Sequence, residues 1–163
     1  MTDLLSNYMA KKCDNKSVGM LVWRGEGLLL IERKKLPFGF APPAGHIDGD
    51  NSFEESAKRE LKEEVGLEIK NLKLLLEGRK ENPCRREGGS WHYWKIYQIE
   101  ATGEVKRSGD ETKQAIFYKK DVLLLLASKT EKYVHGDISQ DYWEKSPGLE
   151  PVWYEWLKEL KII

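Results

Sequence analysis

The pattern of apolar and polar positions in the first third of the chain predicts a β-hairpin, a loop and a helix. Apolar runs at 18–23 and 28–32 are joined by Gly25-Glu26-Gly27, a typical hairpin connection. A loop rich in proline and glycine spans 36–43. Apolar residues then recur every fourth position and form one face of a helix that can pack on a sheet. These residues are Phe53, Ala57, Leu61 and Val65.

The ends of this helix are marked by local signals. Ser52, followed three residues later by Glu55, forms a capping box, so the helix is expected to begin near Phe53. Gly66 is a natural stop.

The remainder of the chain predicts more strands and two further helices. Strands are expected at 72–78, 91–101 and 114–118, and helices at 121–128 and after Pro151. The last helix carries a stripe at i, i+3, i+4 and i+7, which predicts a core face. The stripe consists of Trp153, Trp156, Leu157 and Leu160. A chain of 163 residues with this mixture is expected to form one α/β domain over 1–163.

Charge and hydropathy narrow the functional classes. The 27 basic and 27 acidic residues cancel, and no basic stripe marks a nucleic-acid binder, so nucleic acid is not the expected partner. The short runs Arg33-Lys34-Lys35 and Arg85-Arg86 are either solvated turns or contacts for the phosphates of a small ligand. No segment approaches the roughly 18 apolar residues of a membrane span, and 1–12 lacks the apolar core of a signal peptide. A cytoplasmic location is expected.

The cysteines and one histidine leave two interpretations open. Cys13 and Cys84 are far apart and form no CxxC pattern, so a disulfide framework or zinc module is not expected. With His92 they would make a partial metal site, but two half-buried thiols are the favoured interpretation. His92 is read as a hydrogen-bonded structural residue, with proton transfer as the alternative.

Three glutamates on the helix predict a metal site. Glu60, Glu63 and Glu64 fall within one narrow sector, because side chains three and four apart are neighbours. The like-charge pair at i, i+4 and the two carboxylates in the last turn both disfavour the helix, which is typical of functional positions. Clustered oxygen ligands suit Mg²⁺ or Mn²⁺. Arg59 can hold Glu63 from four residues away.

The region 45–67 resembles the Nudix box, Gly-x5-Glu-x7-Arg-Glu-U-x-Glu-Glu-x-Gly-U, where U is a bulky aliphatic residue. Every fixed position matches except Asn51, where the pattern has glutamate. The resemblance implies an α/β/α sandwich with a mixed sheet. It also implies metal-dependent hydrolysis of a nucleoside diphosphate linked to another moiety, with Mg²⁺ or Mn²⁺ as the ion.

The resemblance also assigns roles to individual residues. Glu60, Glu63 and Glu64 are the candidates for metal binding and for the general base, and Arg59 orients a glutamate. Glu111, before a late strand, is the candidate for an additional metal ligand. Asn51 keeps a hydrogen-bond acceptor without the charge, so Asn51→Glu is expected to raise activity modestly through Arg59.

Candidate substrate contacts lie outside the glutamate cluster. They are Gly45, whose backbone can approach a ligand, Arg33 for phosphate, and Trp94 for stacking on a base. For Trp94 and its aromatic neighbours, core packing of alternate residues is the competing interpretation.

Two functions and several substrates stay open at this point. An enzyme is favoured over a Nudix-fold module that only binds or senses a nucleotide, because all three helix glutamates are present. Pro83 lies sixteen residues beyond Leu67, roughly where enzymes that resemble the ADP-ribose subfamily carry a proline. Nucleoside triphosphates remain alternatives. The expected partner is a small nucleotide, and a homodimer is a further expectation.

Overall fold

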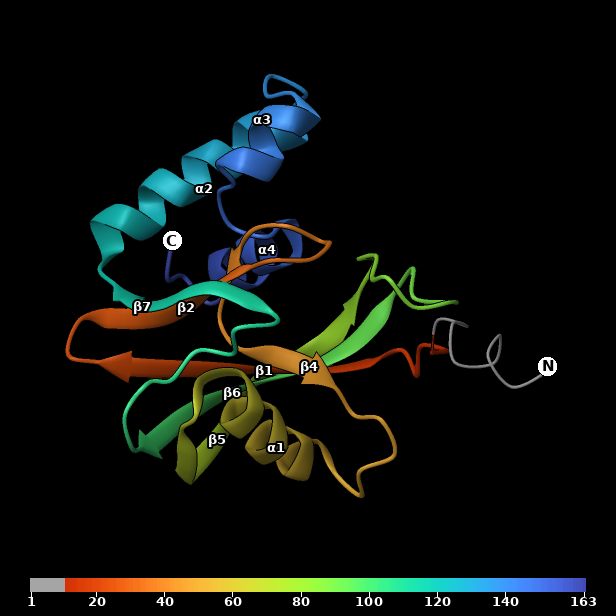
Figure 1. Cartoon of the computed structure of the whole chain (residues 1–163), viewed down its shortest axis with the longest axis vertical. Helices are drawn as coiled ribbons and strands as arrows, with labels where there is room; N and C mark the ends of the chain where they lie inside the picture. Colours follow the sequence, from red (N-terminus) through yellow and green to blue (C-terminus); the bar gives the residue numbers. More distant parts are fainter. Residues whose placement is uncertain (1–10) are drawn as a thin grey trace.

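A mixed β-sheet forms the centre of the computed structural model, which describes residues 11–163 (Figure 1). Its strands run in the order β3-β2-β1-β6-β5, with β4 paired to β1 and β7 paired to β2. β1 and β6 are parallel, and the other strand pairs are antiparallel. The strands are β1 (Lys16–Arg24), β2 (Gly27–Arg33), β3 (Phe40–Ala41), β4 (Ala44–His46), β5 (Glu68–Lys80), β6 (His92–Thr102) and β7 (Thr112–Tyr118).

The longer strands match the predicted ones, and the short ones were missed. β1 and β2 form the expected hairpin, with Arg24 opposite Gly27. β5 extends well beyond 72–78 because the pairing with β6 continues through polar positions at the sheet edge. β3 and β4 have two and three residues, too few to show a period, and pairing with β2 and β1 holds them in place.

The helices begin and end largely where the local signals place them. α1 (Phe53–Val65) has the Ser52 hydroxyl accepting a hydrogen bond from the Glu55 amide at 3.1 Å, and it ends at Gly66 as predicted. α2 (Lys120–Val134) continues past the predicted 121–128, and α4 (Pro151–Glu159) follows Glu150 as expected. α3 (Gln140–Lys145) was not predicted, because six residues are too short for helical periodicity to be recognised.

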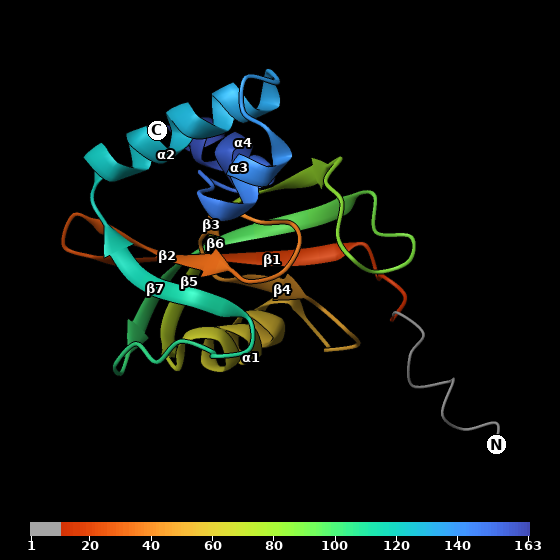
Figure 2. The same cartoon turned by 45° about the horizontal axis from the view of Figure 1, so that its top comes forward.

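Two apolar cores lie on opposite faces of the sheet, which gives the α/β/α sandwich that the Nudix resemblance implied. Successive residues of β1 alternate between them, so Met20 packs on the α1 side and Leu21 on the α4 side. Figures 1 and 2 show α1 on one face and α2, α3 and α4 on the other. The predicted core stripe is confirmed for Trp153, Trp156 and Leu157, which are buried, while Leu160 is partly buried.

Within residues 11–163, no helix has both the length and the apolar character needed to cross a membrane.

Candidate active site

A cavity of about 190 Å³ opens where the N-terminal ends of β1 and β6, β4, α1 and the loop between β5 and β6 meet. It brings together most of the residues that were predicted from the sequence. Glu60 and Glu64 enter from α1, and Glu111 enters from the segment before β7. Arg33, Gly45 and Trp94 line it as well, whereas Glu63 is outside the lining and its side chain is 59% exposed.

Glu60 and Glu64 are pressed against β4, so the short strand positions both carboxylates. The Ala44 amide donates to Glu64 Oε2 at 3.3 Å. A Cβ at Gly45 would lie 2.1 Å from Glu60 Cδ, so any side chain there would displace this glutamate. We conclude that the box has glycine at position 45 because only glycine leaves room for the Glu60 side chain against β4.

Burial makes the carboxyl cluster reluctant to ionise when no cation is bound. It raises the pKa of Glu60 to about 7 despite the opposing charge of Arg59. Burial also raises the pKa of Glu64 well above its ordinary value, and the charge of Glu60 adds to the effect. The charge of Glu111 raises both pKa values further, which places its carboxylate near the pair. A divalent cation with oxygen ligands fits this donor set and would relieve the repulsion.

These shifts predict opposite pH dependences with and without metal. A raised carboxyl pKa contributes stability that is fully present below the unfolded value of about 4.5 and is lost as the pH rises through about 7. The melting temperature in EDTA should therefore fall between about pH 5 and pH 8, while the increase caused by Mg²⁺ should grow, because metal binding needs ionised ligands.

Thermal melts across this pH range, with and without Mg²⁺, measure both effects. Glu60→Gln is the control, because it should reduce the slope of both curves, with the remainder due to Glu64. A Mg²⁺ effect that shrinks as the pH rises would contradict the assignment.

Arg59 connects the glutamates to the loop that precedes α1. Its guanidinium donates to Asp50 Oδ2 at 3.0 Å, to Glu60 Oε1 at 2.8 Å and to the His46 carbonyl at 3.1 Å. Its contact with Glu63 Oε2 is longer, at 3.4 Å. Arg59 therefore contacts Glu63 as expected, and its shorter bond holds Glu60, which the sequence did not indicate.

The departure of Asn51 from the box has a simple structural explanation. Asn51 is exposed, and its backbone N–H donates to Glu55 Oε2 at 2.9 Å as part of the helix cap. The preceding residue, Asp50, supplies the carboxylate for Arg59 and also accepts a bond from the Ser56 hydroxyl at 2.7 Å. The expected gain from Asn51→Glu loses its basis, because Arg59 already has an acidic partner.

We now expect Asp50→Asn to lower turnover about tenfold, because it weakens a charge-assisted bond that orients Arg59 and, through it, Glu60. Asn51→Glu, its neighbour in the same loop, should change turnover less than about twofold. Steady-state kinetics of the two variants side by side provides the measurement. A clear gain from Asn51→Glu, or no loss from Asp50→Asn, would show that position 51 rather than Asp50 supports Arg59.

The structure favours the core-packing interpretation of Trp94 over stacking on a base. Its side chain is only 4% exposed, and its ring packs edge-on against Trp153 and Trp156 with centroids 5.5 and 6.4 Å apart. Its indole nitrogen donates to Asn82 Oδ1 at 3.0 Å. Trp94 belongs to the core and only borders the cavity. The alternation of side chains along β6 was predicted correctly, but it did not show which face of the strand is core.

Arg33 faces the cavity but already has partners. Its Nε donates to the Pro37 carbonyl at 2.7 Å and lies 3.9 Å from Glu150 Oε2. Its charge also lowers the pKa of Glu64. Contact with substrate phosphate stays a prediction for this residue.

Sequence reasoning missed three residues of the site. Glu150 lies buried in the cavity wall, where burial raises the pKa of its carboxyl and Arg33 opposes the shift. Its only sequence signal was a position before the proline of α4. His46 had no signal beyond its place inside the box, and Asp50 had only its position beside Asn51.

Comparison with known proteins supports the same conclusion as the site. The NUDIX domain model matches residues 14–142. An ADP-ribose pyrophosphatase from Methanocaldococcus jannaschii is 35% identical over 121 residues, which cover 72% of this chain and 69% of that protein. A MutT Nudix hydrolase from Burkholderia pseudomallei has a similar fold, with a TM-score of 0.58 and 22% identity over 66% of this chain and 84% of that one. A MutT protein from Bacillus halodurans gives 0.56 and 23%, over 82% and 84%.

The chain therefore belongs to the Nudix family of hydrolases. It is a pyrophosphohydrolase that acts on small nucleotide derivatives, and like the family it needs a divalent metal ion. The retained glutamates, together with Asp50 in place of the missing acidic residue, agree with an enzyme rather than a binding module.

Proposed function

We propose that the enzyme hydrolyses ADP-ribose or a closely related nucleotide sugar, with Mg²⁺ or Mn²⁺ as its metal. The observation that carries this proposal is a second cavity of about 410 Å³ that adjoins the first. The two cavities share a wall between the loop before β3 and the loop between β5 and β6. The shared residues are Leu36, Pro37, Asn82, Pro83, Cys84, Arg85 and Glu150.

The two cavities differ in chemistry in the way that such a substrate requires. The first holds the carboxylates together with Lys35 and Arg86, and it suits a metal-bound pyrophosphate. The second is mainly apolar and is lined by Phe38, Tyr133 and Trp143, which suits a nucleoside. ADP-ribose carries a sugar on each side of its pyrophosphate and can span both regions. A nucleoside triphosphate instead ends in a charged phosphate.

Two sequence relationships support the same substrate class. Pro83, whose spacing pointed to the ADP-ribose subfamily, stands on the shared wall. The curated relative from Methanocaldococcus jannaschii is named an ADP-ribose pyrophosphatase.

In the proposed mechanism, Glu60, Glu64 and Glu111 would hold the metal, and the exposed Glu63 would add a ligand from the rim. A divalent metal held there would supply positive charge to the pyrophosphate and to its leaving phosphate. Arg59 fixes Glu60 in the cavity through the bond at 2.8 Å. Water attacks one phosphorus atom, the P–O bond of the bridging oxygen breaks, and a carboxylate of the cluster takes the proton from the water. The products of ADP-ribose are AMP and ribose 5-phosphate.

Location and assembly complete the proposal. We place the enzyme in the cytoplasm, where the thiols of Cys13 and Cys84 would stay reduced. The homodimer stays a prediction, and analytical ultracentrifugation would measure it.

A panel of substrates tests the proposed specificity. Values of kcat/KM for ADP-ribose, other nucleotide sugars, nucleoside triphosphates and dinucleoside polyphosphates should rank ADP-ribose or a related sugar first. A triphosphate that is preferred at least tenfold would overturn the substrate assignment while leaving the family unchanged.

Phe38→Ala should raise the KM for ADP-ribose about tenfold with little change in kcat, because the lost apolar contact amounts to about 1.4 kcal/mol. Leu125→Ala provides a control, since Leu125 is 71% exposed and lies outside both cavities. An equal effect in both variants would argue against a nucleoside in the second cavity.

A further inference from the structure

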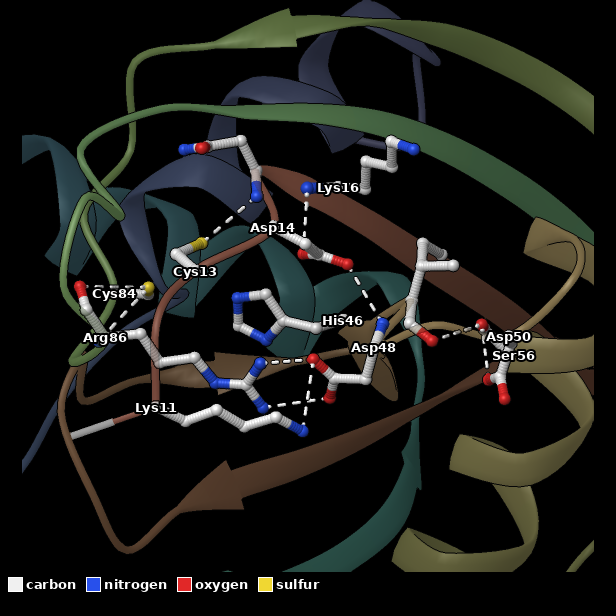
Figure 3. Close-up of polar contacts among 12 residues, drawn as sticks. Lys11, Cys13, Asp14, Lys16, His46, Asp48, Asp50, Ser56, Cys84 and Arg86 are labelled. Atoms are coloured by element: carbon white, nitrogen blue, oxygen red, sulfur yellow. Dashed lines mark hydrogen bonds and ion pairs between the residues drawn. The ribbon is translucent and has the colours of Figure 1, made fainter. Parts of the chain in front are cut away.

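Two cysteines and two histidines from distant parts of the chain meet beside the active-site cavity. Cys13 precedes β1, His46 ends β4, Cys84 lies in the loop between β5 and β6, and His92 begins β6. One ligand atom from each of the four side chains lies within 4.8 Å of all the others. Figure 3 shows the two sulfur atoms and the His46 ring directed toward one another from separate segments. Such a set is larger than the partial site considered from the sequence.

The two imidazoles are oriented as metal ligands. His92 Nδ1 lies 3.0 Å from the Asn82 carbonyl, so this nitrogen carries the proton, and the lone pair on Nε2 faces Cys13 Sγ at 3.3 Å. His46 Nε2 is buried and has no hydrogen-bond partner within residues 11–163. A buried nitrogen without a partner calls for a ligand.

A backbone N–H group points at each of the two sulfur atoms. The backbone N–H of Asn15 donates to Cys13 Sγ at 3.3 Å, and the backbone N–H of Arg86 donates to Cys84 Sγ at 3.4 Å. Each donor is two residues beyond its cysteine, and each favours the negatively charged sulfur. A Cβ at Gly89 would lie 2.1 Å from Cys84 Sγ, so only glycine lets the loop close around this sulfur.

An ion pair holds two of these segments together. Arg86, in the loop that carries Cys84, makes two hydrogen bonds to the carboxylate of Asp48, which follows β4, and one of them is 3.0 Å long. The Asp48 amide in turn donates to Asp14 Oδ2 at 2.9 Å, next to Cys13. Figure 3 shows this network beside the sulfur atoms.

We propose that this cluster binds one structural Zn²⁺ ion, separate from the catalytic metal. Its four ligands are Cys13, His46, Cys84 and His92. Two thiolates and two imidazoles select Zn²⁺ over the hard cations that carboxylates prefer. Tetrahedral bonds of about 2.1 to 2.3 Å separate the ligand atoms by about 3.4 to 3.8 Å, so a small contraction of the observed cluster closes the shell. Four protein ligands leave no open position, which defines a structural site.

The ion would fix the wall of the substrate cavity. It would join the segment before β1 and the end of β4 to the loop 81–91, and residues 82–86 of this loop line the active-site cavity. His46 also connects the two metal sites, because its carbonyl accepts the bond from Arg59. Loss of the ion should therefore loosen substrate binding and lower stability together. This inference does not depend on the proposed substrate.

Metal analysis of the untagged protein tests the proposal. Protein purified without chelator, dialysed against Mg²⁺ and measured by inductively coupled plasma mass spectrometry should retain about one zinc per chain. Protein reconstituted with Co²⁺ should show the absorption of a tetrahedral site with sulfur ligands. Zinc far below one per chain, after incubation with Zn²⁺ under reducing conditions, would overturn the proposal.

Variants distinguish zinc at this cluster from zinc at the carboxylate site and from a disulfide between the two cysteines. Cys84→Ser should lose the zinc, whereas His135→Asn, at an exposed histidine outside the cluster, and Glu64→Gln, at the carboxylate cluster, should keep it. Equal zinc in Cys84→Ser and the parent would overturn the assignment. If Cys84→Ser fails to fold, titration of the parent with an organomercurial should release one zinc as its two thiols react. If neither cysteine reacts and the mass of the protein is lower by two hydrogens, the two cysteines form a disulfide, which would contradict the zinc site.

Discussion

Glu64→Gln should lower turnover at least about a hundredfold while the fold stays intact, which corresponds to about 2.7 kcal/mol of lost transition-state stabilisation. The side chain is buried against β4 and shares the cavity with Glu60 and Glu111, so the substitution removes a charge from the centre of the metal site. Steady-state kinetics at saturating metal provides the measurement. A rate within a few-fold of the parent would remove Glu64 from the metal site.

Stability should change in the opposite direction to activity. Glutamine can still accept the bond from the Ala44 amide, and it ends the charge repulsion with Glu60. The melting temperature of Glu64→Gln without metal should be unchanged or higher, and added Mg²⁺ should stabilise the parent more.

Glu63→Gln should also lose at least about a hundredfold in turnover if the exposed carboxylate joins the metal. A near-normal rate for this variant would restrict the metal site to the cavity carboxylates.

Arg59→Lys should lower turnover about thirtyfold even though the charge is kept. The guanidinium reaches Asp50, Glu60 and the His46 carbonyl at the same time, with bonds of 2.8 to 3.1 Å. A lysine ammonium has no planar array of donors and cannot make the same three contacts in this geometry. Glu60 would then be misplaced, which affects kcat more than KM.

Kinetics and metal titration of Arg59→Lys measure this effect. Lys58→Arg, on the exposed face of the same helix, serves as the matched control and should behave like the parent. An activity of Arg59→Lys close to that of the control would show that charge alone suffices and would contradict the positioning role.

Local signals in the sequence were sufficient to predict the helix that carries the candidate metal-binding glutamates. Its capping box, apolar face and terminal glycine depend on neighbours within a few residues, and all three are found in the structure. The placement of Glu60 and Glu64 in one cavity follows directly from their spacing on this helix. Glu111 was found through the family resemblance, because no local pattern brings it to α1.

Features that depend on chain topology could not be predicted. Asp50 replaces the missing acidic residue because the loop after β4 directs it toward Arg59, and spacing alone pointed to Asn51. The histidines and cysteines of the proposed zinc site have irregular spacing, and only the parallel pairing of β1 with β6 brings Cys13 to His92. Alternation on β6 gave two faces without showing which one is core, so the sequence left both interpretations of Trp94 open.

Product analysis with ADP-ribose is the most direct test of the proposed activity. The protein is incubated with ADP-ribose and Mg²⁺ or Mn²⁺, and the products are identified by mass, with EDTA and Glu64→Gln as the two controls. We expect AMP and ribose 5-phosphate in equal amounts, formed only with metal and strongly reduced in Glu64→Gln. Intact ADP-ribose, under conditions in which the same preparation cleaves a nucleoside triphosphate, would contradict it.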